Sequence, residues 1–259
     1  MSSSPYRSLT ILLFLLSGLL AAQSTFDADP ARRDTLRNLL GAFPTGVPLD
    51  LDTLETVDLE GGVRLKIAYT VELPDPVFDT PIDRISAYLF VPDRQGEERL
   101  PAIVAIHQDG PQAHLGKEEP AGLAGADDMH YALELFQRGY VVICPDRYYH
   151  AGRRRIVGAD TAGTDWDRED GMISHWTGQL LMRGRTPTGK EAYDLVRTTD
   201  VLVDVDGVDT SRIGTIGHSA GGYVMVYFMF VDPRIKAGVS SCGFHEVMGF
   251  YMSLPARYS

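Results

Sequence analysis

One serine of this sequence lies between two glycines, in a segment that reads G-H-S-A-G from Gly217 to Gly221 with Ser219 at its centre. The segment fits the pattern G-x-S-x-G and stands between an expected strand and an expected helix. A serine on so tight a turn adopts a strained backbone, and the glycines on either side let the chain pass. The serine oxygen then projects above the carboxyl ends of the strands, where the first N–H groups of the helix, beginning with that of Ala220, face a developing oxyanion. The spacing therefore predicts nucleophilic chemistry at this serine.

The elements around the serine motif alternate between strands and helices from Arg84 onward. Apolar runs that alternate with helical stretches are typical of a mostly parallel sheet covered on both faces. We therefore expect an α/β fold with a doubly wound, mostly parallel sheet. The expected strands are Ile85 to Val91, Ala102 to Gln108, Tyr140 to Cys144, Ile213 to Ile216 and Ile235 to Ser240, and the expected helices are Tyr131 to Arg138, residues 189–204 and Ala220 to Phe230.

Composition and charge exclude several classes of protein. The 259 residues are 44% hydrophobic and include only two cysteines, which excludes a disordered chain and a disulfide scaffold. The net charge of -11 argues against a nucleic-acid partner, because neutralising phosphates takes a clustered positive surface. We expect one globular domain over residues 81–259, preceded by a lead-in segment over residues 23–80.

The first 22 residues are typical of a secretory signal peptide. Arg7 is followed by the mostly apolar run Leu9 to Leu20 and then by the small residues Ala21 and Ala22. An uncleaved membrane anchor is the alternative, but about 12 apolar residues are fewer than the roughly 20 that span a bilayer. We therefore expect cleavage near Ala22, no stable membrane anchor afterwards, and a mature protein that is secreted or periplasmic.

Six further segments, on both sides of the serine motif in the sequence, carry residues that can be compared with those of known families. They are Ala105 to Gln108, Gly116 to Leu123, His130 to Ala132, Arg138 to Val142 with Pro145-Asp146, Asp232 to Lys236 and Ser240 to Phe244. Together with the motif they resemble the α/β hydrolases, and within them the dienelactone hydrolase and acetyl xylan esterase-like group. The resemblance runs from about Arg84 to Phe244.

This resemblance implies a serine hydrolase that needs no cofactor. It implies that Ser219 is the nucleophile, that the N–H of Ala220 is one oxyanion donor, and that the main-chain N–H of Gln108 is the other. Such an enzyme transfers the acyl group of a carboxylic ester to the serine and then to water. The expected partner is a small-molecule or carbohydrate ester substrate. A serine peptidase shares the motif and stays an open alternative.

The end of the sequence departs from the pattern of the family. In this fold the triad acid and histidine follow the nucleophile on loops after later strands, whereas only 40 residues follow Ser219 here. The stretch from Cys242 to Ser259 is shorter than one strand-helix-strand unit of about 30 residues. The last two strands and the usual acid and histidine are therefore expected to be absent. His245 and Glu246 are the candidates for a substitute base and a substitute acid, with an exposed loop histidine as the alternative for His245. Because a serine without a base is a poor nucleophile, a non-catalytic fragment or degenerate hydrolase-fold protein is the alternative.

The remaining histidines are expected to support the structure of the site and not to bind a metal. None of the seven forms H-E-x-x-H or a comparable ligand set, so we expect no metal. His107 is expected to pack under the oxyanion loop. His218 is expected to point away from the serine or to pack beneath it.

Two clusters could contact substrate. Arg153 to Arg155 suit a carboxylate-bearing substrate such as a uronate, with a solvated loop face as the alternative. The aromatic residues Tyr148, Tyr149, Trp166 and Trp176 could line a sugar or aryl pocket, with core or loop packing as the alternative.

The two cysteines are expected to be unpaired. By the strand order of the family, Cys144 and Cys242 end strands that are three spacings, or about 14 Å, apart. A disulfide needs Cα atoms about 4.4 to 6.8 Å apart. Both thiols are therefore predicted to be free and buried.

Overall fold

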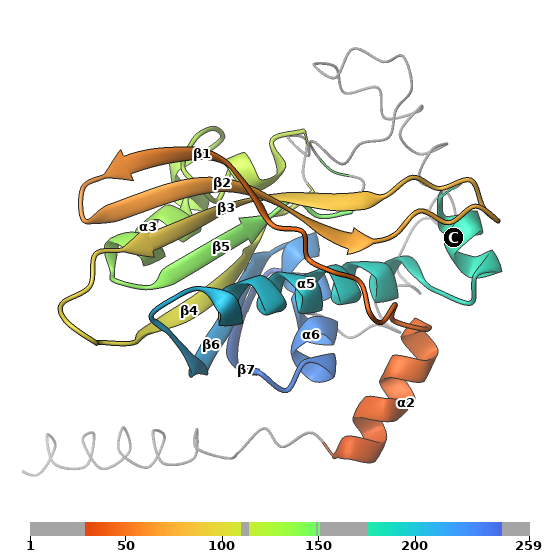
Figure 1. The fold of residues 1–259 in the computed structure, drawn as a ribbon. Coiled ribbons are helices and arrows are strands. Elements are labelled where there is room, and N and C mark those ends of the chain that lie inside the picture. Colours follow the sequence, from red (N-terminus) through yellow and green to blue (C-terminus); the bar gives the residue numbers. More distant parts are fainter. Residues whose placement is uncertain (1–28, 110–113, 149, 151–175, 245–259) are drawn as a thin grey trace, which may run out of the picture.

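The computed structural model of the protein describes residues 29–109, 114–148, 150 and 176–244 (Figure 1). Every strand and helix expected from Ile85 onward is present, although several ends differ by a few residues. The elements are α2 (Pro30–Leu40), β1 (Asp52–Leu59), β2 (Gly62–Glu72), β3 (Asp83–Pro92), β4 (Leu100–Ile106), η1 (Gly116–Glu118), η2 (Asp127–Met129), α3 (Tyr131–Gln137), β5 (Val141–Pro145), α5 (Pro187–Asp204), β6 (Val208–His218), α6 (Ala220–Val231) and β7 (Ile235–Ser241).

One sheet of seven strands runs through the described part of the molecule in the order β1-β2-β3-β5-β4-β6-β7. The strands β1, β2, β3 and β5 are antiparallel neighbours. The strands β5, β4, β6 and β7 are parallel neighbours. The chain passes through α3, α5 and α6 as it connects the parallel strands, which confirms the α/β class. The serine motif lies in the parallel half.

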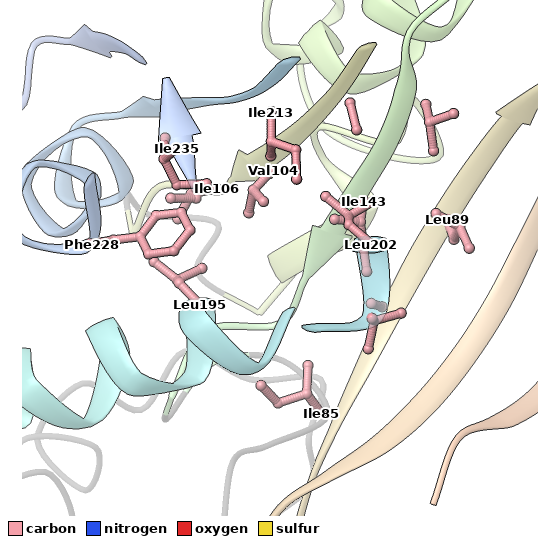
Figure 2. Packing of buried hydrophobic residues seen from close by; sticks show 14 of the residues in the cluster. Ile85, Leu89, Val104, Ile106, Ile143, Leu195, Leu202, Ile213, Phe228 and Ile235 are labelled. Atoms are coloured by element: carbon pink, nitrogen blue, oxygen red, sulfur yellow. The ribbon is translucent and has the colours of Figure 1, made fainter. Parts of the chain in front are cut away.

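Helices cover both faces of this sheet. Side chains along each strand alternate between the faces, so each strand contributes to a core on either side. On β3, Ile85 and Leu89 join a core that also contains residues of α5 and α6. Tyr88 and Phe90 point the other way and join a second core with Phe136 of α3. The larger core is shown in Figure 2, where the labelled side chains from the strands meet those from the two helices: Ile85, Leu89, Val104, Ile106, Ile143, Leu195, Leu202, Ile213, Phe228 and Ile235.

The expected lead-in segment contributes two strands to this sheet. β1 pairs with β2, and β2 pairs with β3, so the expected boundary at residue 80 lies between neighbouring strands of one sheet. Residues 52–72 are therefore part of the same structural unit as the rest of the sheet. β1 is an edge strand with mostly exposed side chains, and for that reason its sequence lacks the apolar run of a buried strand.

The two cysteines are unpaired, as expected, but only one of them is buried. Cys144 is fully buried in β5, whereas Cys242 follows β7 and is exposed. The strand order places β4 and β6 between β5 and β7, which gives the expected three strand spacings. The prediction that Cys242 is buried is wrong because the side chains of β7 are mostly exposed.

No helix within the described ranges is long and apolar enough to cross a membrane. The expected signal peptide, residues 1–22, lies outside those ranges. It therefore stays a prediction.

Candidate active site

Ser219 occupies a strained turn between β6 and α6. Its backbone has φ 50° and ψ −120°, in a region that residues with a side chain rarely adopt. Two hydrogen bonds hold the turn: Ser219 N–H donates to Ser241 O at 2.7 Å, and Tyr223 N–H donates to Ser219 O at 2.9 Å. Such a conformation costs about 1–3 kcal/mol and persists only where the surrounding structure imposes it. The strain expected from the sequence pattern is confirmed.

The glycines of the motif make room for this turn. A Cβ at Gly217 would lie 2.4 Å from the carbonyl oxygen of Gly221. A Cβ at Gly221 would lie 2.4 Å from Ile106 O and 2.5 Å from His107 O, at the end of β4. The first turn of α6 therefore packs directly on the backbone that leads into the loop of Gln108. Both positions need glycine, because a Cβ would clash with backbone atoms, which cannot rotate away as a side chain can.

The strand register brings Gln108 and Ser219 to the same edge of the sheet. β4 and β6 are parallel neighbours, and Ile106 pairs with Gly217, two residues before Gln108 and Ser219 respectively. The side chain of Gln108 is held by Glu119, because its Nε2 donates to the two carboxylate oxygens at 3.1 and 3.2 Å. Ala220 begins α6, so its N–H is among the first-turn groups that have no acceptor inside the helix. Both expected oxyanion donors thus lie at the carboxyl ends of the two strands.

His107 packs beneath this loop with no exposed surface. Its Nε2 accepts a hydrogen bond from the main-chain N–H of Arg147 at 2.9 Å, so the proton sits on Nδ1, which donates to Gln108 O at 2.7 Å. Burial lowers the pKa of His107 well below its ordinary value, and the positive charges of His150 and Arg147 lower it further. A neutral ring with both nitrogens engaged is a structural support, which agrees with the packing expected from the sequence.

Arg147 connects the same loop to helix α5. Its Nη1 lies 2.5 Å from Asp109 Oδ1, and its Nη2 lies 2.8 Å from Glu191 Oε1. Burial alone would lower the pKa of Arg147, but the two carboxylates outweigh burial and raise it. Burial alone would likewise raise the pKa of Asp109, but the charge of Arg147 and the hydrogen bond from His150 hold it far below its usual range. The four side chains form a charged cluster at the carboxyl ends of β4 and β5.

His150 contacts the neighbouring segments through both ring nitrogens. Its Nε2 lies 2.8 Å from Asp109 Oδ1, and its Nδ1 lies 2.8 Å from Tyr148 O. These contacts tie His150 to the loop after β4 and to the segment after β5.

His218 contacts the neighbouring strand, since its Nδ1 lies 2.9 Å from the hydroxyl of Ser241 on β7. This contact agrees with the supporting role expected for His218. The substitute base His245 and the substitute acid Glu246 lie outside the described residues. Their roles stay predictions.

The sequence did not predict the cluster of Asp109, Arg147, His150 and Glu191. One signal was available, because Asp109 and Arg147 each follow closely after a buried strand, at the edge where open α/β sheets bind ligands. The pairing of these side chains with Glu191 depends on how α5 packs, which no local pattern reveals.

A second charged cluster bears on metal binding. Within the described ranges, the carboxylates of Glu72, Asp83 and Asp194 form the one group whose ligand atoms all lie within 4.8 Å of one another. Lys190 Nζ contacts all three, at 3.1 Å from Glu72 and 2.8 Å from Asp83, and in a short ion pair with Asp194. Burial alone would raise the pKa of Glu72, but the positive charges of Lys190 and Arg185 lower it. The Lys190 ammonium thus supplies the positive charge that a metal ion would bring.

Two members of the expected aromatic cluster lie together. Tyr148 and Trp176 line one pocket with Leu180 and Arg183. The other members, Tyr149 and Trp166, and the basic run Arg153 to Arg155 lie outside the described residues. Tyr148 is buried, and the ammonium of Lys190 lies 4.9 Å from the centre of its ring, so the structure favours the alternative of core packing for this residue.

Sequence comparisons point to hydrolases. The profile of the prolyl oligopeptidase family (peptidase S9) matches residues 169–259, a stretch that contains Ser219. A protein of Bacillus subtilis (strain 168) that bears the name "Putative hydrolase YtaP" is 27% identical over 239 residues, which cover 87% of this chain and 71% of that protein.

Solved structures with a similar fold include two esterases. A putative acetyl xylan esterase from Bacteroides fragilis superposes with a TM-score of 0.62 at 20% identity, over 81% of this chain and 51% of that chain. The acetyl xylan esterase from Paenibacillus sp. R4 superposes with a TM-score of 0.54 at 17% identity, over 88% of this chain and 63% of that chain. The chain has the α/β-hydrolase fold. The chain spans 51% and 63% of the lengths of these two proteins. The resemblance to the acetyl xylan esterase-like group is thus confirmed for the fold.

Proposed function

We propose that this protein is an extracytoplasmic serine hydrolase that cleaves carboxylic esters of small molecules or carbohydrates. The observation that carries the proposal is the strained Ser219 at the junction of β6 and α6, with Gly221 packed against the end of β4. Strain of this kind is concentrated at functional sites, because it must be maintained at a cost in stability. The similarity to the "Putative hydrolase YtaP" of Bacillus subtilis and to acetyl xylan esterases supports the reaction class.

In the proposed reaction, the oxygen of Ser219 attacks the carbonyl carbon of the ester. The carbonyl oxygen becomes an oxyanion that accepts hydrogen bonds from the main-chain N–H groups of Ala220 and Gln108. The base takes the serine proton and passes it to the leaving alcohol as the ester bond breaks, which leaves an acyl-enzyme. Water then attacks the acyl-enzyme, releases the acid and restores the serine. On this chain His245, with Glu246 beside it in sequence, is the candidate base.

A serine peptidase is the second candidate. The match to the prolyl oligopeptidase family favours it, since the matched stretch includes the serine motif. The same nucleophile and oxyanion donors would act on an amide in place of an ester. The two candidates therefore differ in substrate and not in the role of Ser219.

Turnover of three substrates separates these possibilities. We expect the purified chain to hydrolyse 4-nitrophenyl acetate and acetylated xylo-oligosaccharides, and not a prolyl peptide anilide. Ser219→Ala should lower ester turnover by at least about 10³-fold, because removal of a nucleophile abolishes the covalent route. Ser211→Ala is the matched control, because Ser211 is exposed near the opposite end of β6.

Cleavage of the anilide alone would favour the peptidase. Ester turnover that survives Ser219→Ala would refute the proposal. A folded chain with no turnover of any of the three substrates would support the alternative of a protein that binds without catalysis.

A further inference from the structure

The side chain of Arg147 contacts the loop after β4 on both sides of Gln108. Arg147 Nη1 donates to His107 O at 3.4 Å and to Asp109 Oδ1 at 2.5 Å. The main-chain N–H of Arg147 also donates to the His107 ring at 2.9 Å. One residue of the segment after β5 thus fixes the residue before Gln108 and the residue after it.

We propose that Arg147 is a positioning residue that sets the place of the Gln108 N–H in the oxyanion hole. This role rests on the proposed function, because it presupposes that an oxyanion forms at Ser219. Arg147 acts through the backbone of the loop and does not need to touch the substrate.

The arginine is itself held rigidly enough for this task. Its side chain is only 6% exposed, and its Nη2 pairs with Glu191 Oε1 of α5 at 2.8 Å. A planar guanidinium with acceptors on two edges has little freedom to turn, whereas an ammonium at the same place would reach fewer of them. The loop is therefore tied through Arg147 to a helix that packs on the sheet.

Other contacts hold the neighbourhood but not both neighbours of Gln108. Tyr131 Oη donates to Ile106 O at 2.6 Å, one residue before His107. Glu119 holds the side chain of Gln108 but not its main chain. Two contacts within the loop would remain without Arg147, since the His107 ring donates to Gln108 O at 2.7 Å and His150 Nε2 lies 2.8 Å from Asp109 Oδ1. Loss of the Arg147 guanidinium would therefore leave the strand end in place and loosen the loop beyond it.

The chemistry makes such a release costly for turnover. Oxyanion donors act when they lie about 2.7–3.1 Å from the developing charge, and a misplacement of about 1 Å lowers the rate by about 10²-fold. Substrate binding does not depend on the oxyanion, because the charge develops only in the transition state. A positioning role therefore predicts a fall in kcat with an unchanged KM.

The test compares Arg147→Met with Arg234→Met. Arg234 is the matched control, because it is half-buried and pairs with two carboxylates, Asp200 and Asp232, beside the first residue of β7. The substrate is 4-nitrophenyl acetate, and the second readout is the inhibition constant of phenylboronic acid, which forms a tetrahedral adduct on a nucleophilic serine. Arg147→Lys is a milder variant that serves if Arg147→Met does not fold.

We expect Arg147→Met to lower kcat by about 30- to 100-fold with KM within about twofold, and to weaken boronate inhibition by a similar factor. Arg147→Lys should fall between Arg147→Met and the wild type. Arg234→Met should leave kcat, KM and the inhibition constant within about twofold of the wild type.

A kcat of Arg147→Met or Arg147→Lys equal to that of Arg234→Met would overturn the positioning role. A rise in KM at constant kcat would overturn it as well, because that result indicates a binding role. If the wild type shows no turnover that depends on Ser219, the proposed function fails and this role fails with it. The wild-type control thus tells the two failures apart.

Discussion

The glycine at position 221 offers a sharp test of how the serine turn is built. In Gly221→Ala the new Cβ would lie 2.4 Å from Ile106 O and 2.5 Å from His107 O. Both oxygens belong to the backbone, so relief requires either the start of α6 or the end of β4 to move. Adding a methyl group to a site packed this tightly costs about 3 kcal/mol, near the upper end of the usual range. For a domain of this size, that loss corresponds to a fall in Tm of about 6–12 °C.

Gly178→Ala is the matched control for this substitution. Gly178 lies in the helical residues 176–182, and a Cβ placed there meets no described atom within 4 Å. Alanine in a helix is favoured over glycine by about 0.5–1 kcal/mol, so this variant should be slightly more stable than the wild type. Thermal unfolding followed by circular dichroism measures both variants. If Gly221→Ala unfolds within about 2 °C of Gly178→Ala, the close contact between α6 and the end of β4 is not present in solution.

Two further predictions concern buried ionisable groups. Lys190→Met should lower the free energy of unfolding by about 3–5 kcal/mol at pH 7.5 in urea titrations, because three carboxylates lose their shared cation, whereas the exposed Lys236→Met should change it by less than about 0.5 kcal/mol. The folded state depresses the pKa of Glu72, so the contribution of Glu72 to stability is present above its ordinary pKa of 4.5 and is lost as the pH falls. The stability cost of Lys190→Met should therefore shrink below pH 4.5. A cost that does not change with pH would contradict the pairing. Iodoacetamide should alkylate the exposed Cys242 of the native protein but not Cys144, whose thiol is fully buried with its pKa raised by burial; equal rates in mass spectra would show that the burial of Cys144 is wrong.

The sequence predicts the buried half of the fold well because burial leaves a local signature. β4 and β5 are short apolar runs with interior side chains on both faces, and such runs can be recognised without knowledge of their partners. β1 has no such signature, because its side chains are mostly exposed and several of them are acidic. Only its pairing with β2 makes it a strand. The same reason explains Cys242, whose exposure depends on the open face of β7.

The candidate site divides in the same way. The place of Ser219 follows from a local steric requirement, since the strained turn needs glycine at Gly217 and Gly221 wherever the motif occurs. The contacts of Arg147 with Asp109 and Glu191 join a loop after β4, a segment after β5 and a helix more than 35 residues further along the chain. No periodicity or motif encodes contacts of that kind, because they arise only when the three elements pack together.

Covalent labelling tests directly whether Ser219 is an activated nucleophile. The full chain is incubated with a fluorophosphonate, and the modified residue is located by mass spectrometry of its peptides, with Ser219→Ala and Ser211→Ala treated in parallel. We expect one adduct, on Ser219, which disappears in Ser219→Ala, persists in Ser211→Ala and forms more slowly in the presence of 4-nitrophenyl acetate. A well-folded chain that takes up no label, or takes it up equally well without Ser219, would show that Ser219 is not an activated nucleophile.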